Sequence, residues 1–583
     1  MARSTLLRVF AAPMLALCAA VLSTTGCQIL LGIGGELPLE EGGSGGTGAA
    51  STGGAGGDST TAGAGGAPST GGLGGTGGGI GGTGGGGGAG LGEPCTPGEV
   101  GICYSGPPGT ADVGICKSVP TVCNHGGEWE PCGHGEVLPE AESCAAPEDE
   151  DCNGADCVLW MRAFVGEAFG TGIGIDAQGN IVATLTFKEP IDFGDGEPVV
   201  PNGNSDVAIL KFDKSGKLLW KKTPVSPGQQ SIRDLDVSPS GDIVIGGDTY
   251  GNMNLGGAAG TIGGGAFVAK LDPDGYALWA RTAQTTDGIG AVEFVAQDSM
   301  GNVIAAGNEP DIDFGTGKLT GPDTLAFYLA SLDGATGQPQ WVKLAQAEGR
   351  QKLGGLSVGP SDDIVLLGTL ESQHLGLGPD NFNSCCGERP FVARLPPDGS
   401  YVDGEVFAGG MGVELKLDPN GLVVDSQGVA TTCGTFEKMV NFDSGKYDVG
   451  MWRTAFVVHE ATPSTLQWSR AYLGEMAVSE GRHLALDGED NIVVVGTYGG
   501  PVDFGNGIPP DSENQYVLKL DKNGNVKWLQ TFFFGDGSIQ GVAGGTLENE
   551  TAVIGTFFGG VDLGLTTGEV DATQGVFILR MAD

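Results

Sequence analysis

Positive charge and histidine are scarce in this chain of 583 residues. Lys and Arg number 29 against 71 Asp and Glu, which gives a formal net charge of −42, and the chain has five histidines. A field of that sign repels the phosphates of nucleic acids and anionic membrane surfaces. We therefore expect no nucleic-acid partner, and we interpret the acidic excess as a solvated surface.

Common catalytic motifs are also missing around these histidines. None belongs to a His-Glu-x-x-His helix or accompanies a Gly-x-Ser-x-Gly elbow, and the Gly-rich segment has no Gly-Lys-Ser/Thr ending for a phosphate-binding loop. His483 could point toward a central channel, but we interpret it as a structural residue. The sequence thus predicts a protein without catalysis or cofactor, although paired carboxylates for glycoside hydrolysis would be invisible at this level.

The first residues are typical of an export signal. Arg3 and Arg8 accompany an apolar run from Val9 to Leu22, which is too short for a good membrane span. The segment "LSTTGC" that follows resembles the cleavage site of bacterial lipoproteins, although Thr24 stands where such sites usually carry Leu or Val. The resemblance implies residues 1–27 as a signal peptide, a lipid on Cys27 and an outer-membrane or cell-surface location; plain secretion is the alternative.

Residues 28–94 form a Gly-rich stretch that accounts for much of the chain's 110 glycines. Segments such as "GGTGGGGGAG" have no apolar period and almost no charge, so they cannot bury enough surface to offset their ordering entropy. We expect a flexible tether with a root-mean-square reach of about 40 Å.

Residues 95–157 are rich in cysteine. An even number of cysteines in a short exported segment predicts a disulfide-stapled module with four bridges. Eight cysteines allow 105 pairings, so the sequence assigns no partners, and the absence of paired Cys-x-x-Cys knuckles argues against zinc. The eight are Cys95, Cys103, Cys116, Cys123, Cys132, Cys144, Cys152 and Cys157.

The segments "CYSGPPGTADVGIC", "GEWEPC" and "DEDCNGADC" give this module a family likeness. They resemble a cysteine-rich module of bacterial surface proteins that includes a copper-binding region. The resemblance implies metal binding, with copper as the candidate ion; the alternative that we favour is a stapled spacer with a solvated acidic turn. The candidate ligands are His125, His134, Asp149, Glu150 and Asp151. Calcium is a second candidate ion, for aspartates that recur once per repeat in the rest of the chain, although their spacing is wrong for one compact oxygen cage.

The rest of the chain, residues 158–583, repeats with a period near sixty. Large aromatic residues mark the period, and several short apolar strands fall within each unit, which predicts a β-propeller. In one unit the strands are "GIGID", "IVATLTF", "DVAILKFD" and "KLLWKK", and the third strand has six further copies along the chain, seven in all. The aromatic residues, which we expect in the core between blades, are Trp160, Trp220, Trp279, Trp341, Tyr401, Trp468 and Trp528.

Hairpins such as "DKSGKLLW", "DPDGYALW" and "DKNGNVKW" resemble the repeats of seven-bladed propellers in bacterial surface proteins. The resemblance implies an all-β fold of seven four-stranded antiparallel blades. The segment "SLDGATGQPQW" also resembles the docking repeat of quinone-dependent propeller dehydrogenases, but we interpret it as one more of these hairpins. Aspartates and asparagines in a second repeat, "IDFG", are expected to accept hydrogen bonds from nearby backbone N–H groups.

The last blade lacks room for a fourth strand, because the chain stops at Asp583. Val158–Phe164 matches the fourth-strand pattern and has no blade of its own, so we expect it to pair antiparallel to Val576–Arg580 and close the ring. We also expect Cys433 to form a disulfide with Cys385 or Cys386.

Two classes of function remain. We favour a surface-tethered, monomeric binding or scaffold protein with a protein or glycan partner; the alternative is an exported hydrolase or lyase acting on a polysaccharide. Long, variable loops on a rigid scaffold are where recognition usually occurs. The expected contact loops are Lys188–Ser205, Ser372–Arg389 and Glu437–Arg453.

Overall fold

The computed structural model describes residues 94–583 except 108–109, 133–134, 146–147, 154–156, 287, 289, 322–325, 346–348, 372–374, 378–388, 401–402, 407–416, 443–445, 461–465, 510–512, 534–536, 547–548 and 560–573. Several residues singled out above therefore lie outside the described part. They are the whole signal and linker with Cys27, and also His134, Cys385, Cys386 and Tyr401.

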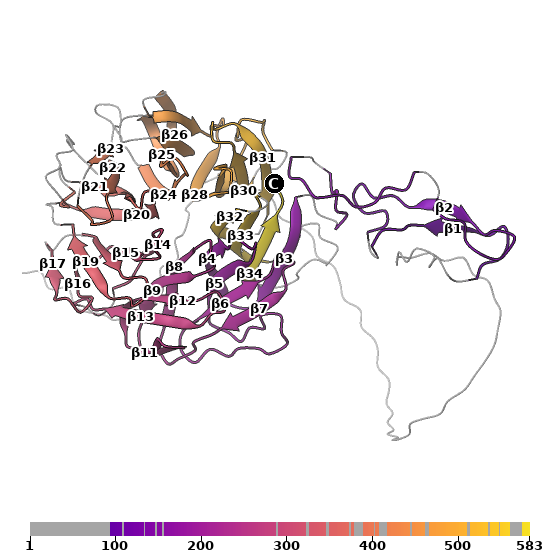
Figure 1. Cartoon of the computed structure of the whole chain (residues 1–583). Coiled ribbons are helices and arrows are strands. Elements are labelled where there is room, and N and C mark those ends of the chain that lie inside the picture. Colours follow the sequence, from indigo (N-terminus) through magenta and orange to yellow (C-terminus); the bar gives the residue numbers. More distant parts are fainter. Residues whose placement is uncertain are drawn as a thin grey trace, which may run out of the picture. The chain divides into compact units, whose positions relative to one another are not determined.

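Seven four-stranded antiparallel sheets surround a central axis, which confirms the seven-bladed propeller (Figure 1). The innermost strand of each blade comes first in the chain, and the described residues contain no helix. The bounds of blades 1 to 4 are β4 (Ala168–Ile175), β5 (Ile181–Phe187), β6 (Asp206–Phe212), β7 (Leu218–Lys222); β8 (Gln230–Val237), β9 (Ile243–Thr249), β12 (Gly265–Leu271), β13 (Ala277–Ala283); β14 (Phe294–Gln297), β15 (Val303–Gly307), β18 (Tyr328–Leu332), β19 (Pro339–Leu344); and β20 (Gln351–Val358), β21 (Ile364–Leu370), β22 (Arg389–Leu395), β23 (Asp403–Val406).

Three further blades and three small sheets complete the described strands. Blades 5 to 7 are β24 (Leu417–Val424), β25 (Ala430–Asn441), β26 (Lys446–Glu460), β27 (Leu466–Ala471); β28 (Val478–Leu486), β29 (Ile492–Gly499), β30 (Glu513–Leu520), β31 (Val526–Phe532); and β32 (Ser538–Gly544), β33 (Thr551–Phe558), β34 (Gln574–Met581), β3 (Val158–Val165). The small sheets pair β1 (Val100–Cys103) with β2 (Val119–Val122), β10 (Met253–Gly256) with β11 (Gly260–Ile262), and β16 (Asp311–Ile312) with β17 (Leu319–Thr320).

The ring closes as the sequence predicts. β3 pairs antiparallel with β34, with Trp160 opposite Arg580 and Phe164 opposite Val576. The last residue also holds the segment that leads into β3, because the Cys144 N–H donates to the Asp583 carbonyl at 3.1 Å. A strand from the start of the propeller therefore covers the edge that the end of the chain would otherwise leave open.

The cysteine-rich module contains four disulfides, as expected for a stapled segment. The structure decides the connectivity that spacing left open. The pairs are Cys95–Cys123, Cys103–Cys132, Cys116–Cys152 and Cys144–Cys157.

Five blades have a tryptophan on the outer strand that docks on the next blade. The Trp160 indole N–H donates to the Lys214 carbonyl at 3.0 Å, and Trp279 does the same to Gly334 at 3.0 Å. The acceptors lie in the hairpin between the third and fourth strands of the following blade. The same bond recurs in Trp220 to Pro273, Trp341 to Pro397 and Trp468 to Lys522.

The hairpin glycine lies under the docked ring, which explains the Gly of the repeated motif. In "SLDGATGQPQW", Gly337 has φ = 65°, and a Cβ atom there would lie 2.5 Å from the Trp279 ring. Asp333 accepts hydrogen bonds from the backbone N–H and the hydroxyl of Thr336, which shapes the turn. This segment therefore docks blade 2 on blade 3 and, through Trp341, blade 3 on blade 4.

Because blade 7 takes its outer strand from the start of the propeller, one hydrogen bond of the repeat is missing at Trp528. Its indole nitrogen is buried without a hydrogen-bond partner. The following blade is blade 7, whose fourth strand comes from residues 158–165, so no third-to-fourth-strand hairpin exists there to supply a carbonyl. The sequence predicted that these aromatic residues lie in the core between blades. This is confirmed for four buried residues, Trp160, Trp279, Trp468 and Trp528, whereas Trp220 and Trp341 are half-buried.

Buried ion pairs lie at the same end of the blades as the docked tryptophans, where Lys211 Nζ donates to the same Pro273 carbonyl as the Trp220 indole. Lys211 on β6 contacts Asp176 at 3.0 Å, and Lys519 on β30 contacts Asp487 at 2.8 Å with both side chains inaccessible to solvent. Lys519 also contacts Asp583 at 2.6 Å. Burial alone would raise the pKa of Asp176, but hydrogen bonds from Asn180 and Lys211 outweigh it and the pKa is lowered.

The long loops follow the predicted Asx pattern. Asp192 Oδ1 accepts hydrogen bonds from the N–H groups of Gly194 and Gly196, and Asp313 and Asp503 make the equivalent pairs of bonds. In blades 1, 3 and 6 one carboxylate thus shapes its own loop, as side chains of this type do in turns.

The predicted disulfide of Cys433 is wrong. Cys433 is a free, fully buried thiol on β25, and burial raises its pKa well above the ordinary value. It belongs to the core that blade 5 shares with blade 6, together with Leu484 and Tyr516. The side of blade 5 that packs against blade 4 is a different cluster, so the thiol faces away from the blade that carries Cys385 and Cys386.

We predict that a chain beginning at Gly166 aggregates or melts far below residues 94–583. It loses the β3–β34 ladder and the burial of Val158, Trp160 and Phe164, and burying one large apolar side chain is worth about 1.5–3 kcal/mol. A chain beginning at Val158 is the control, because it lacks the cysteine-rich module and keeps β3. Equal melting temperatures by calorimetry for chains beginning at 158 and 166 would refute the closure.

We predict that Gly337→Ala destabilises the propeller more than Gly428→Ala. Both glycines have positive φ, 65° and 79°, so both variants incur a left-handed strain of about 1–2 kcal/mol. A Cβ at Gly428 meets nothing within 4 Å, whereas one at Gly337 overlaps Trp279 and adds about 1–3 kcal/mol. Urea unfolding of both variants measures the difference, and equal losses would contradict the docking.

Candidate functional site: a cationic pocket beside the propeller axis

A ring of irregular residues surrounds the axis. Six of the seven innermost strands carry a β-bulge at the same place in the repeat. A bulge re-aims a side chain and is common beside functional sites. With the equivalent residue of blade 3, the bulge ring consists of Thr171, Arg233, Glu293, Gly354, Asn420, Arg482 and Gln540.

Partners on the second strands orient members of this ring. Arg233 Nε donates to Asp248 Oδ1 at 2.9 Å, and the Thr556 hydroxyl donates to Gln540 Oε1 at 2.9 Å. Asn308 likewise donates to the Glu293 carboxylate. A channel of about 430 Å³, lined by all seven innermost strands, runs through the ring.

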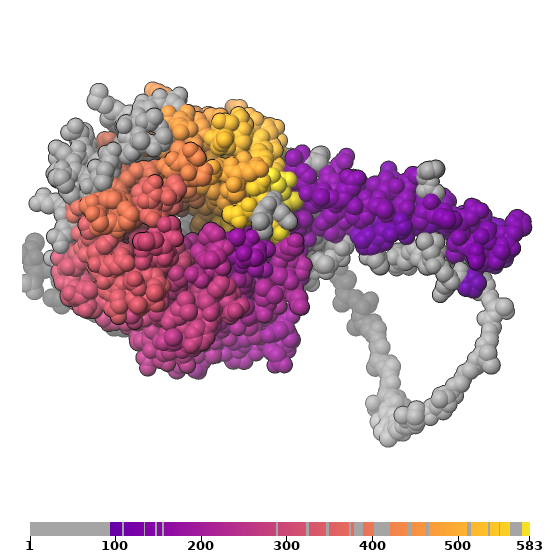
Figure 2. Space-filling view, viewed as in Figure 1, coloured from indigo at the N-terminus to yellow at the C-terminus, as the bar shows by residue number. Residues whose placement is uncertain are grey.

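A second cavity, of about 500 Å³, lies between blades 4, 5 and 6, and a hollow is visible near the middle of the propeller (Figure 2). It shares Gly354, Asn420 and His483 with the channel lining, so the two spaces are adjacent. We call this cavity the cationic pocket. Its lining residues are Lys352, Leu353, Gly354, Gly368, Thr369, Asn420, Arg453, Glu480, Arg482 and His483.

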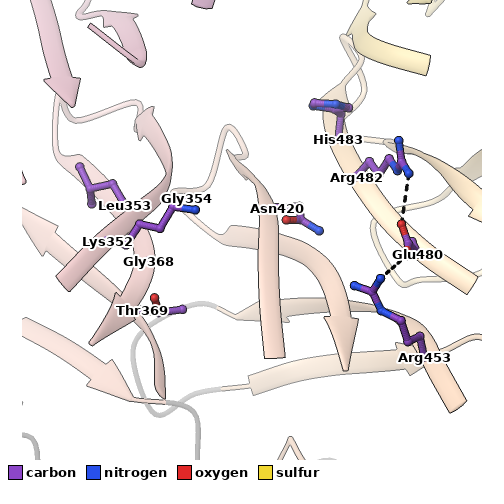
Figure 3. A pocket seen from close by; sticks show the side chains of 10 residues that line it. All are labelled: Lys352, Leu353, Gly354, Gly368, Thr369, Asn420, Arg453, Glu480, Arg482 and His483. Atoms are coloured by element: carbon purple, nitrogen blue, oxygen red, sulfur yellow. Dashed lines mark hydrogen bonds and ion pairs between the residues drawn. The ribbon is translucent and has the colours of Figure 1, made fainter. Parts of the chain in front are cut away.

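Positive side chains from three blades dominate the pocket (Figure 3). Arg453 on β26 and Arg482 on β28 both contact Glu480, with N–O distances of 2.6 and 3.2 Å. Lys352 on β20 has no ion pair with any described residue. Three cationic side chains and one carboxylate line the pocket, and a second carboxylate outside the lining, Glu437, lies 3.8 Å from Arg453 Nε. The site is therefore positive in a protein of net charge −42.

The packing of β28 on blade 5 brings these groups together. The Ser479 hydroxyl accepts a hydrogen bond from the Ala455 N–H and donates to the Tyr472 carbonyl, both at 2.9 Å. Asn420 on β24 donates to the Gly481 carbonyl at 3.0 Å. A Cβ at Gly481 would lie 3.1 Å from the backbone of blade 5, so the glycine permits the close approach.

His483 lines both the pocket and the channel. Burial, and secondarily the nearby Arg482, lower its pKa to about 4. The imidazole is therefore neutral at neutral pH and offers one donor and one acceptor to a ligand. The sequence raised this placement but favoured a structural role for the residue.

The channel wall opposite these cations is acidic. Asp234 on β8 lines the channel, and burial raises its pKa to about 7, although the N–H groups of Val295 and Leu235 donate to it. Burial also raises the pKa of Asp236. The channel lining therefore has carboxyl groups on blades 2 and 3, with Arg233 beside them, whereas the basic groups of blades 4 to 6 line the adjacent pocket.

The candidate metal ligands are only partly brought together. Asp149 and Asp151 lie with Glu142, which the sequence did not single out, and their ligand atoms are within 4.8 Å of one another. His125 and Glu150 are not members of this cluster. A donor set of carboxylates suits a hard cation such as calcium better than copper.

Much of this cluster serves the local turn. Glu142 accepts from the N–H groups of Cys157 and Asp151, at 2.8 and 3.1 Å. Asp149 and Asp151 both accept from the Asn153 N–H at 3.0 Å. Burial raises the pKa of Glu142 to about 7. These bonds are those expected of the stapled acidic turn.

None of the protein-family models and none of the curated proteins matches this chain. Solved propellers do match. The WD40 repeats of RRP9 align at TM-score 0.41 and 11% identity over 73% of this chain and 99% of that one. A catalytically inactive virginiamycin B lyase from Staphylococcus aureus with quinupristin aligns at 0.36 and 9%, over 72% and 99%. The quinohemoprotein alcohol dehydrogenase from Comamonas testosteroni aligns at 0.35 and 9%, over 76% and 78%.

These likenesses extend to the architecture alone, since identity is low and the TM-scores lie below 0.5. The seven sheets and their order in this chain establish the fold independently of them. A search of the described residues for a helix of sufficient length and apolarity to cross a membrane finds none.

We predict that Glu142→Gln changes stability in a pH-dependent way. The pKa of Glu142 is higher in the folded than in the unfolded chain, so its protonation favours folding below about pH 4.5 and that contribution is lost as pH rises through about 7. The melting temperature of the variant relative to the native protein should therefore be higher at pH 8 than at pH 5. Exposed Glu140→Gln is the control, and an identical pH response in both variants would contradict the prediction.

Proposed function

We propose that this chain is an exported, lipid-anchored binding protein without catalysis, whose propeller holds a ligand at the cationic pocket. The observation that carries the proposal is the convergence of charged and polar side chains from three blades on a cavity of about 500 Å³. Cavities of this size with a few convergent polar groups are the usual form of ligand sites.

The position of the pocket supports this role. Its groups come from the start of β28, the end of β21 and the middle of β26, which meet at the end of the blades that carries the long loops. Arg453 is the last residue of Glu437–Arg453, which the sequence predicted to be a loop that contacts a partner. The described part of that segment lies mostly in strands β25 and β26 instead. Much of Ser372–Arg389 lies outside the described residues.

The chemistry of the described lining favours binding over catalysis. Glycoside hydrolysis needs two carboxyl groups, and the described lining of the pocket offers one, Glu480, which two arginines engage. A lyase needs a base, and a His483 with a pKa of about 4 is a weak one. A polysaccharide hydrolase or lyase is thus the second candidate, favoured only by the presence of His483 beside Arg482.

Export and tethering follow from other features. Four disulfides in the described module are typical of extracytoplasmic proteins. A lipid on Cys27 would anchor the chain, and the Gly-rich linker would let the propeller reach about 40 Å from the membrane toward a protein or glycan partner.

We expect cells that express the chain to incorporate labelled palmitate into it, and Cys27→Ala to abolish the label. The Cys433→Ala variant is the matched control, because Cys433 is buried in the propeller and should keep full labelling. Labelling that persists in Cys27→Ala would refute the anchor and leave plain secretion.

Binding is tested with residues 94–583 on an oligosaccharide array, followed by mass spectrometry of each bound sugar. We expect at least one sugar to bind and to be recovered unchanged after prolonged incubation. Recovery of a shortened or unsaturated product would overturn the proposal in favour of the enzyme.

A further inference from the structure

We infer that the ligand of the cationic pocket is an acidic oligosaccharide, a hydroxyl-rich molecule that carries carboxylate groups, and that Glu480 occupies the anion position when no ligand is bound. The inference rests on the proposed binding function and assigns its ligand class. Three features of the pocket carry it: its charge, the polarity of its lining and the bridging position of Glu480.

The pocket has more cationic side chains than carboxylates to pair with them. Arg453 and Arg482 share the carboxylate of Glu480, and Lys352 lies on the other wall (Figure 3). Glu437, outside the lining, lies 3.8 Å from Arg453 Nε, so three cations face two carboxylates. The arginines come from neighbouring blades, so their positions are fixed by the ring rather than by one mobile loop. Guanidinium groups bind carboxylates through paired N–H donors, with bonds about twice as strong as neutral ones.

The remaining lining selects a polar ligand. Thr369 and Asn420 offer a hydroxyl and an amide, and His483 adds a neutral imidazole. Leu353 is the one large apolar side chain among the described lining residues, so an apolar ligand would find little surface to cover. A volume of about 500 Å³ also exceeds what a single small oxyanion fills. Sugar rings with a carboxylate are polar, carry the negative charge that the arginines bind, and are large enough for a cavity of this volume.

The acidic surface of the protein further limits which charged ligands can bind in the pocket. A ligand of high charge density, such as a nucleic acid, is repelled by a protein with a net charge of −42. A short ligand with few carboxylates is repelled less, because protein charges farther than about 8 Å from it are largely screened at physiological salt. A local positive site then decides where such a ligand binds.

Glu480 occupies the position in which a ligand carboxylate would bind, so it competes with the ligand for the two arginines. Its two oxygens each contact a different arginine, Oε1 with Arg453 and Oε2 with Arg482. Its side chain is about a quarter exposed, so solvent and ligand can reach the pair. A ligand carboxylate that takes over one of these contacts leaves Glu480 on the other. Removing the charge of Glu480 should therefore take this competing carboxylate away from both arginines, while Arg453 keeps its 3.8 Å contact with Glu437.

The test uses residues 94–583 and titration calorimetry with three probes: tetragalacturonate, the same tetramer fully methyl-esterified, and inorganic sulfate. We expect tetragalacturonate to bind at least tenfold more tightly than the ester or sulfate, and more weakly at high salt. Arg453→Gln and Arg482→Gln should each weaken it at least tenfold, and Glu480→Gln should tighten it several-fold. Arg233→Gln, at the same ring position on blade 2 but outside the pocket, should stay within twofold.

Each alternative outcome has a separate meaning. Equal binding of the acid and its ester would overturn the assigned charge while the binding function stands. Sulfate binding as tight as that of the tetramer would identify a small-oxyanion site instead. Binding that Arg233→Gln weakens as much as Arg482→Gln would place the ligand elsewhere, and no binding of tetragalacturonate would overturn the ligand class, with the array deciding the function. Melting curves of all variants check that each remains folded.

Discussion

The docking of a tryptophan on the hairpin of the next blade is the interaction on which the propeller depends. Five described blade junctions repeat it, with indole-to-carbonyl distances of 3.0 to 3.2 Å. The ring covers apolar surface, its N–H finds an acceptor, and the glycine beneath leaves room for it. Because the hairpins of blades 1, 2, 3 and 6 each receive a ring and lead to the next tryptophan, local turn chemistry acts from one blade to the next.

The junction between blades 6 and 7 shows what this arrangement costs. Blade 7 borrows its outer strand from residues 158–165, so the hairpin is missing and the Trp528 indole nitrogen is left without an acceptor. Other contacts hold the junction: Lys519 reaches both Asp487 and the terminal Asp583, and Lys527 adds a contact to Asp583 at 3.1 Å. The C-terminal residue thus replaces part of a hairpin.

Because the docked blades form a rigid ring, residues on the innermost strands can differ from one blade to the next. Bulges place one variable residue per blade around the axis, and second-strand partners such as Asp248 and Asn308 match the residue that they support. The cationic pocket is one product of that variation, with Arg482 at a bulge and Arg453 supplied by the neighbouring blade. An acidic wall at Asp234 and Asp236 is another.

The repeat of aromatic residues, the Asp-x-x-Gly hairpins and the spare strand at Val158–Phe164 determined the propeller and its closure from sequence, because these features act through contacts that each unit repeats. The even cysteine count predicted a stapled module. Tertiary structure alone decided which cysteines pair, that Cys433 faces blade 6 as a free thiol, and that Glu142 joins Asp149 and Asp151. It also decided the pocket, since Lys352, Arg453 and Arg482 are separated by up to 130 residues and meet only because the ring places blades 4, 5 and 6 side by side.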